Sequence, residues 1–451
     1  MTEVDERAVL IVVALASSLA PLNSTMIAVA LPGIMDQLAV PVANASWLVT
    51  GYLIAMASLQ PVAGKLGDRF GRRRLILLGL IYFCLVSLGA ALSSSFAWLL
   101  FFRLQQGISG AMVFPNGSAL LREIVPAERR AGRFGLVGAA IGVAAATGPI
   151  LGGFLVGTLG WQAIFYVNLF IILPALWLGW RKIPMAHTTG SAARFDLVGA
   201  LLLSGTLIGV AWLLTQVRQG ETRLLLPGSL VAVGLIALLF VYEMRIADPV
   251  LQPRFFRYRS FAAASGTVLF SNLALYTTLL TIPIALTQAG GWSEVRVGFV
   301  LLFMTATMVL FTPVGGRLAD KMGRRWPVVG GMALMTTGFI ILAIGQTSSI
   351  LPLLLIGLGV SGTGLGIASP GQQTAALESV APRESGAAAG VYSTARYLGS
   401  ITGSSLLAAL LAGSGEQATD FTPIFILIVG AGFVAILFSL RLEDRPTVQE
   451  S

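Results

Sequence analysis

The stretch GKLGDRFGRRR at residues 64–74 recurs as GRLADKMGRR at residues 316–325, 252 residues further along the chain. The two copies align without a gap, and the shared positions are Gly64 with Gly316, Leu66 with Leu318, Asp68 with Asp320, Gly71 with Gly323, Arg72 with Arg324 and Arg73 with Arg325. A match of this length at one offset indicates that a structural unit occurs twice. The chain is therefore expected to consist of two similar halves.

The composition is that of a membrane protein. Of the 451 residues, 56% are hydrophobic and 11% are charged, whereas an average soluble domain has roughly 25% charged residues. Cys84 is the only cysteine and His187 the only histidine, which excludes a disulfide scaffold and a cysteine or histidine metal site. We expect neither a metal nor another cofactor.

Fourteen segments are long and apolar enough to span a bilayer, since a spanning helix needs about 20 mostly apolar residues. They lie at residues 8–31, 44–64, 75–92, 96–119, 134–157, 163–181, 197–217, 224–242, 261–286, 297–316, 327–345, 350–372, 386–412 and 421–440. If each repeated loop joins the second and third helices of a six-helix unit, spans seven and eight are an insertion. We expect an all-α polytopic membrane protein with six-helix bundles at 8–182 and 260–441 and an inserted hairpin at 196–244. Parallel repeats with a substrate site between them form one architecture of secondary transporters.

The positions of the basic residues predict the orientation. Three of the 29 Lys and Arg residues, Arg218, Arg223 and Arg296, lie in loops opposite the termini, and two, Arg103 and Arg396, lie within spans. All others lie on the side of the termini. Because basic loops stay in the cytoplasm, both termini are expected to be cytoplasmic. The net charge of +9 thus reflects topology and contact with the lipid bilayer, and nucleic-acid binding is not expected.

Four further stretches carry a family resemblance. They are LNSTMIAVALP (22–32), FFRLQQGISGA (101–111), GVAAATGPILGG (142–153) and WQAIFYVN (161–168). With the loop at 64–74, they resemble the major facilitator superfamily, specifically its fourteen-span drug:proton antiporter branch. The resemblance covers nearly the whole chain.

The resemblance implies a multidrug-efflux type of secondary active transporter in a bacterial-type plasma membrane. It would export hydrophobic or amphiphilic small molecules as a monomer, driven by the proton gradient. The two six-helix bundles would rock against each other, and the hairpin would not take part in this movement. An enzyme is not expected, because no His, Asp or Glu lies at mid-membrane depth. An ATP-driven pump is not expected either, because the chain has no GxxxxGK[ST] loop.

The repeated loop is a candidate cytoplasmic gate. Gly64, Gly67 and Gly71 would permit a tight turn, and the resemblance implies that Asp68 bridges to a cation or a helix N-terminus across the hairpins when the transporter faces outward. Arg122 is the suggested cation. The candidate gate residues are Gly64, Asp68, Arg69, Gly71, Arg72, Arg73, Arg122, Asp320 and Arg324. The alternative is that the loop only determines topology.

The fifth span is rich in glycine. Because glycine has no side chain, one face of this helix exposes its backbone, and a neighbouring helix can pack closely against it. Pro149 favours a bend. In the family this antiporter motif is associated with export, and its candidate residues here are Gly142, Gly148, Pro149, Gly152 and Gly153. Tight helix packing without a directional role is the alternative.

Arg103 and Arg396 are the candidate functional charges within the spans, because a charge there is costly. For each, a structural role is the alternative. Candidate coupling and cavity residues are Asn23, Thr25, Gln60, Arg103, Gln105, Asn116, Asn272, Tyr276, Tyr392 and Arg396. Asn23 stands where family members typically carry an acidic residue, and an amide cannot carry a proton through a cycle. A facilitator of the same fold for a metabolite or lipid, without classical proton coupling, is therefore the alternative function.

Overall fold

The computed structural model describes residues 6–40, 42–45, 47–184, 196–219, 222–246, 249–288, 294–347, 351–412 and 421–444. His187 lies outside these ranges. The described elements are α1 (Glu6–Leu38), α2 (Val42–Ala45), α3 (Trp47–Phe70), α4 (Arg72–Ala91), α5 (Phe96–Ile124), η1 (Ala127–Arg129), α6 (Arg130–Leu159), α7 (Ala163–Lys182), α8 (Leu197–Gln219), α9 (Thr222–Arg245), η2 (Pro253–Arg257), α10 (Arg259–Gln288), α11 (Glu294–Met322), α12 (Arg325–Thr347), α13 (Leu351–Glu378), η3 (Pro382–Glu384), α14 (Ser385–Ala412) and α15 (Thr422–Ser439).

The protein is all-helical over the described ranges, as the sequence predicted. Helices suit apolar segments because every backbone polar group is satisfied within the helix, without water. Each predicted span overlaps one described helix of 18 or more residues. Within the described residues, eleven helices are both long and apolar enough to cross a membrane.

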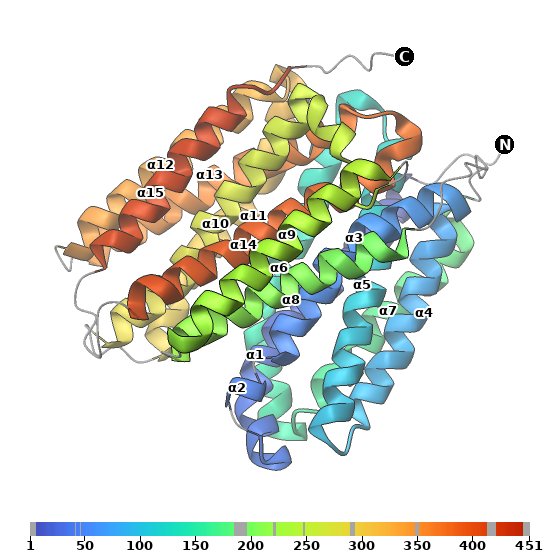
Figure 1. The fold of residues 1–451 in the computed structure, drawn as a ribbon. Helices are drawn as coiled ribbons and strands as arrows, with labels where there is room; N and C mark the ends of the chain where they lie inside the picture. The colour runs from blue at the N-terminus through green and yellow to red at the C-terminus, as the bar shows by residue number, and fades with distance from the viewer. Residues whose placement is uncertain are drawn as a thin grey trace.

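The long helices form two groups with matching internal packing (Figure 1). In the first half, α1 packs against α6 and α7, and α5 packs against α3 and α4. In the second half, α10 packs against α14 and α15, and α13 packs against α11 and α12. The halves contact each other mainly through α3 with α14 and through α6 with α11.

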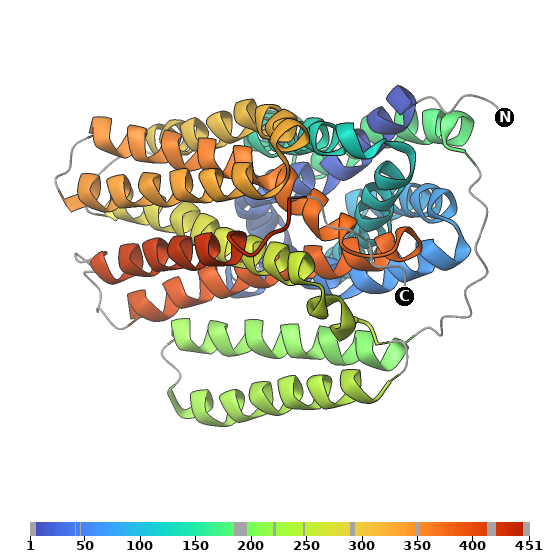
Figure 2. The ribbon, with the colours of Figure 1, turned by 90° about the horizontal axis from the view of Figure 1, so that it is seen from above.

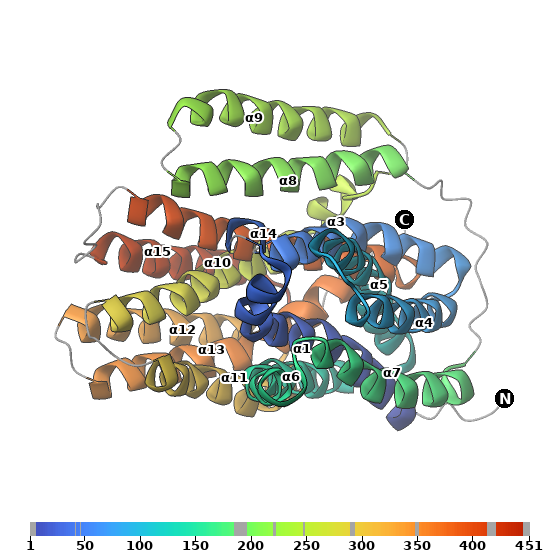
Figure 3. The ribbon, with the colours of Figure 1, turned by 90° about the horizontal axis from the view of Figure 1, so that it is seen from below.

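Helices α8 and α9 pack against each other and lie along one side of the molecule (Figures 2 and 3). Helix α8 contacts both α3 and α14, one helix from each half. A hydrophobic cluster combines Ile54 and Ala57 of α3 with Leu203 and Leu207 of α8, and Leu398 of α14 packs against it. The hairpin therefore touches both halves at their contact.

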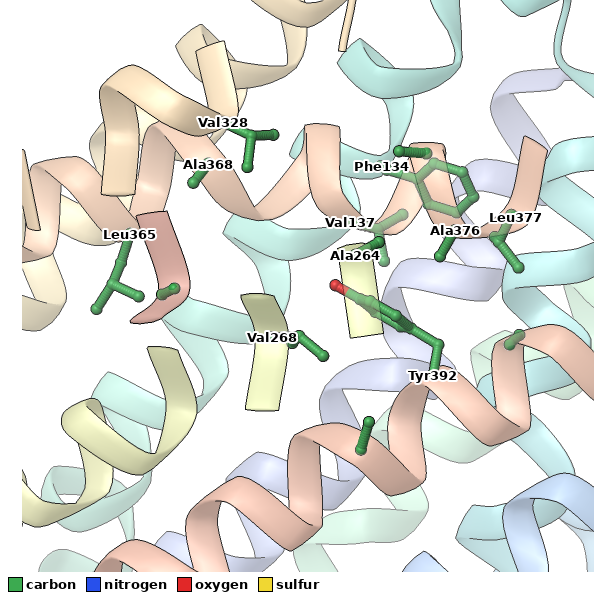
Figure 4. Close-up of a cluster of buried hydrophobic side chains, with 14 of the residues drawn as sticks. Phe134, Val137, Ala264, Val268, Val328, Leu365, Ala368, Ala376, Leu377 and Tyr392 are labelled. Atoms are coloured by element: carbon green, nitrogen blue, oxygen red, sulfur yellow. The ribbon is translucent and has the colours of Figure 1, made fainter. Parts of the chain in front are cut away.

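The main hydrophobic core also continues from one half into the other. Figure 4 shows part of it, with Phe134 and Val137 of α6, Ala264 of α10 and Leu377 of α13 among the labelled residues. Tyr392 of α14 points into this region and is 1% exposed. Apolar contact between the halves thus extends over several helices.

Both ends of the described chain, Glu6 and Asp444, lie at one end of the bundle, here called the terminus end. Glu6 of α1 pairs with Arg133 at the start of α6, at 2.6 Å between Oε1 and Nε. The Asp444 carbonyl accepts a hydrogen bond from the backbone N–H of Arg324, at 3.3 Å. Because the starts of α6 and α12 lie close together, these contacts bring the two ends of the described chain to the same face.

Candidate functional site

Asp68 lies in the last turn of α3 and caps a helix of the other half. Its carboxylate accepts hydrogen bonds from the backbone N–H groups of Gly386 and Ala387 at the start of α14, both at 3.1 Å. It also pairs with Arg72, at 3.0 Å. A helix N-terminus binds an anion because its first N–H groups have no partner in the helix and its dipole end is positive. Asp68 therefore joins the two halves at the terminus end.

Asp320, the repeat equivalent of Asp68, makes the same contact in the opposite direction. From the end of α11 it accepts hydrogen bonds from the N–H groups of Ala131 and Gly132 in the first turn of α6, at 2.9 and 2.7 Å. Its own-half partner is Arg324, at 3.2 Å. Two capping contacts thus cross between the halves.

The two arginines of the repeat also cross between the halves. Arg72 donates to the Pro382 carbonyl of the second half at 2.8 Å and pairs with Glu123 at 2.8 Å. Arg324 donates to the Ala127 carbonyl of the first half at 2.8 Å and pairs with Glu378 at 3.1 Å. Both arginines are buried, so their charges need these partners.

Arg122 does not pair with Asp68, and that expectation is wrong. Its guanidinium donates to the carbonyls of Val380 and Ala381, at 2.6 and 3.3 Å, and to the Ser385 hydroxyl. The physical reason is that Arg72, one turn after Asp68, already neutralises that carboxylate. Arg122 instead satisfies carbonyls between α13 and α14, beside a pocket of about 510 Å³ that Arg130, Asp320 and Glu378 also line.

Two of the candidate gate residues lie away from these contacts. Arg73 donates to the Trp180 carbonyl of α7 in its own half. The Arg69 guanidinium lies over the ring of Phe70, 5.1 Å from its centroid. Both of these contacts stay within the first half.

Gly64 and Gly67 do not form a turn, contrary to the sequence interpretation. Both belong to α3, and only Gly71, with φ 97°, provides the turn into α4. A Cβ on Gly64 would lie 2.0 Å from the Gly386 carbonyl oxygen, and one on Gly316 would lie 2.3 Å from the Ala131 carbonyl oxygen. These glycines therefore allow backbone-to-backbone contact between the halves.

The glycines of α6 serve two helix contacts. A Cβ on Gly148 would lie 1.8 Å from the Thr25 hydroxyl of α1, and one on Gly152 would lie 3.1 Å from Met26. Gly142 faces Val309 of α11, at 2.3 Å. Pro149 lies inside the same helix, whereas a Cβ on Gly153 has only one neighbour, at 4.0 Å. Helix α6 is thus held closely between its own half and the other.

Arg103 is enclosed within the first half. It is fully buried and donates to the side-chain oxygens of Asn23 and Gln106 and to the Leu48 carbonyl. Its guanidinium lies 4.4 Å from the ring centroid of Tyr52. Arg103 Nη2 and Asn23 Nδ2 have no partner among the described residues. Arg103 and Asn23 are therefore brought together, as a pair that contains one charge.

The other candidate cavity residues divide into two sets. In the first set, the polar side chains form hydrogen bonds within a helix or between helices of one half. Thr25, Asn116 and Asn272 donate to the carbonyls of Pro21, Ala63 and Val268, and Gln105 accepts from the Tyr82 hydroxyl. In the second set, Gln60, Tyr392 and Arg396 lie on α3 and α14, the helices that join the halves, and Tyr276 of α10 interacts electrostatically with Arg396. The second set is the better candidate for contact with a substrate.

The sequence interpretation missed Glu123 and Glu378, the partners of Arg72 and Arg324, of which Glu123 is exposed and Glu378 half-buried. They are 255 residues apart, as are the capped residues Ala131 and Gly386. This second offset, three residues longer than the first, could have revealed them. The sequence interpretation also missed Tyr52, because one tyrosine among many apolar residues does not stand out in the sequence.

Comparison with known proteins gives a consistent result. The model of the Major Facilitator Superfamily matches residues 13–267 and 264–451. The Uncharacterized MFS-type transporter YvkA of Bacillus subtilis is 32% identical over 450 residues, covering 100% of this chain and 99% of its own. The Tetracenomycin C resistance and export protein of Streptomyces glaucescens is 33% identical over 417 residues, covering 89% of this chain and 75% of its own.

The fold is also found among solved structures. The human organic anion transporter MFSD10 (TETRAN) superposes with a TM-score of 0.70 and 20% identity, covering 96% of this chain and 99% of its own. At this identity the likeness concerns the fold. The matched models, the full-length relatives and this shared helical arrangement lead to one conclusion: the chain belongs to the major facilitator superfamily.

Proposed function

We propose that this protein is a secondary active transporter that exports hydrophobic or amphiphilic small molecules by alternating access. In this proposal fourteen helices span a bacterial-type plasma membrane, and both termini and the capping contacts of Asp68 and Asp320 face the cytoplasm. The bundles at 8–182 and 260–441 are the moving units, and 196–244 is the inserted hairpin.

The observation that carries the proposal is the reciprocal capping at the terminus end. Asp68 holds the start of α14, and Asp320 holds the start of α6. These polar contacts can separate and form again, because each carboxylate keeps an arginine of its own half, Arg72 or Arg324, when the halves part. An exporter needs this kind of reversible closure on the side from which substrate enters.

Export of hydrophobic compounds is supported by two further observations. A relative named for tetracenomycin C resistance and export is 33% identical over most of the chain. The glycine-rich α6, which carries the antiporter motif, packs directly against α11 of the other half through Gly142. A helix placed there changes its contacts whenever the halves move.

Energy from the proton gradient is the favoured coupling, but one observation supports a second candidate. Asn23 bonds to Arg103 where a carboxylate would carry a titratable proton. A facilitator of the same fold for a metabolite or lipid, without classical proton coupling, accommodates this amide pair. The two candidates differ in whether a pH gradient changes substrate flux.

The deciding experiment reconstitutes the purified chain in vesicles and follows flux of a fluorescent amphiphile with and without an imposed pH gradient. The antiporter proposal predicts gradient-driven accumulation that collapses with a protonophore. Equal fluxes under both conditions would replace it by the facilitator. Absence of any protein-dependent flux across neutral, anionic and cationic probes would contradict both transport proposals.

A further inference from the structure

Arg396 occupies an unusual place in α14. It lies eleven residues beyond Ser385, the first residue of the helix. At about 1.5 Å of rise per residue, this is roughly 16 Å, or about half of the hydrocarbon thickness. The side chain is half-buried, whereas Arg103 is fully enclosed. Arg396 is thus a mid-membrane charge that remains accessible.

The contacts of Arg396 place it between the halves. Its guanidinium lies 5.5 Å from the ring centroid of Phe114 on α5 and 5.4 Å from that of Tyr392 on its own helix. Tyr276 of α10 interacts with it electrostatically. Phe114 belongs to the first half and the others to the second. The charge therefore faces a region that aromatic side chains from both halves surround.

In the described part of the chain, no carboxylate forms an ion pair with Arg396. The ion pairs found there involve Arg72, Arg324 and other arginines near the terminus end, and none involves Arg396. The stabilisation that aromatic faces give to a cation is smaller than the cost of a charge in the membrane interior. An anion at this position would remove most of that cost.

The repeat indicates that Arg396 is not part of the machinery common to both halves. The capped residues Ala131 and Gly386 are 255 positions apart, and this offset places Ile141 opposite Arg396. The gate charges Asp68 and Arg72 both have charged equivalents. A charge present in only one half suits a ligand that has one charged end.

We propose that Arg396 binds the anionic group of an amphiphilic substrate, a carboxylate or sulfonate, while Phe114 contacts its apolar body. This inference rests on the proposed export function and specifies its substrate class. A guanidinium offers two parallel N–H donors to such a group. A lipophilic cation would meet repulsion at the same place.

The test uses three compounds with one steroid scaffold: taurocholate, which is anionic, an uncharged cholamide, and a quaternary ammonium derivative. Flux of each is measured in phosphatidylcholine vesicles containing the wild-type chain, Arg396→Gln, Arg396→Lys or the control Arg257→Gln. Arg257 is an exposed arginine of η2, so this control removes one positive charge elsewhere. Taurocholate binding in detergent is measured by calorimetry.

Wild type and Arg257→Gln should prefer taurocholate over the quaternary derivative. Arg396→Gln should lose about tenfold or more in taurocholate flux and affinity, as expected for one charge-assisted hydrogen bond, while cholamide flux persists. Arg396→Lys should retain part of the preference. Persistent cholamide flux shows that the variant is folded and that the export function stands.

Unchanged taurocholate flux and affinity in Arg396→Gln would overturn the inference and leave the proposed export intact. Loss of taurocholate binding when phosphatidylglycerol is added would also overturn it, because an anionic lipid headgroup would then be the partner of Arg396. If the wild type moves none of the three compounds but moves other probes, the substrate class is wrong. If it moves no probe, the export proposal itself fails.

Discussion

Asp68 and Asp320 are bound to each other's halves in a reciprocal way: each ends a helix of its own half and caps the first turn of a helix in the other. Each also forms an ion pair with the arginine four residues later in the sequence, Asp68 with Arg72 and Asp320 with Arg324. One sequence motif, used twice, therefore closes the terminus end with two equivalent contacts.

Replacing these carboxylates should open the terminus end. Ser118 of α5 bonds to Gln373 of α13 across the halves, at 3.0 Å, and can report this opening as Ser118→Cys in a Cys84→Ser background. Asp68→Asn and Asp320→Asn should each increase maleimide labelling by about tenfold, the effect of losing charge-assisted hydrogen bonds. The double variant should exceed either single one. Labelling equal to the parent in all three would contradict a closing role.

A methyl group at Gly64 should prevent normal closure. The Cβ of Gly64→Ala would lie 2.0 Å from the Gly386 carbonyl oxygen, so α3 and α14 must separate. We expect flux to fall by about tenfold, in line with the cost of overpacking. Gly157→Ala is the matched control, because no atom lies within 4 Å of that Cβ, and it should keep parental flux. Equal effects of the two changes would refute the close-contact argument.

Two arginine substitutions should differ sharply in thermal stability. Arg324→Ala removes the partner of Asp320 and Glu378 at a buried position, and breaking such a group costs about 3–5 kcal/mol. Arg254→Ala removes a pair with Glu384 in which the arginine side chain is 55% exposed, and exposed pairs contribute about 0–1 kcal/mol. Thermal unfolding in detergent should show a large decrease for Arg324→Ala only. Similar melting temperatures for both variants would count against the buried network.

Asn23→Asp should supply the missing charge beside Arg103. The guanidinium already contacts the Asn23 oxygen, so a carboxylate would pair with it without rearrangement. We expect higher thermal stability and a larger ratio of flux with a pH gradient to flux without one. Asn116→Asp is a suitable comparison, since Asn116 donates to the Ala63 carbonyl and a carboxylate there loses that bond. A lower melting temperature for Asn23→Asp would show that the site is closed to a second charge.

Hydropathy predicted the helices well because each one satisfies its own backbone in an apolar segment, and the repeat at 64–74 and 316–325 indicated two related halves. The family followed from the same motifs and is confirmed. The partners of the gate residues were harder to predict. Asp68 accepts hydrogen bonds from the backbone N–H groups of Gly386 and Ala387. Because nearly every residue type has a backbone N–H group, the sequence does not reveal which residues Asp68 binds.

The polar residues within the helices show the same limit. Sequence position alone did not distinguish Asn116, which bonds to the Ala63 carbonyl, from Arg396, which faces aromatic rings of both halves. Both are polar residues in apolar helices. Only the packing of α5 against α3 and α14 separates a helix-to-helix hydrogen bond from a cation that lies over aromatic rings of both halves.

The place of α8 has a consequence for how the halves can move. Leu203 and Leu207 share one apolar cluster with Ile54 of α3 and with Leu398 of α14. Any rotation of one half against the other must therefore shear this cluster or carry the hairpin with one half. In either case α8 acts as a lateral shield, since acyl chains could not enter between α3 and α14 along the side that it covers. In the proposed alternating-access cycle, this added pair of helices would thereby keep lipid out of the contact between the halves while it opens and closes.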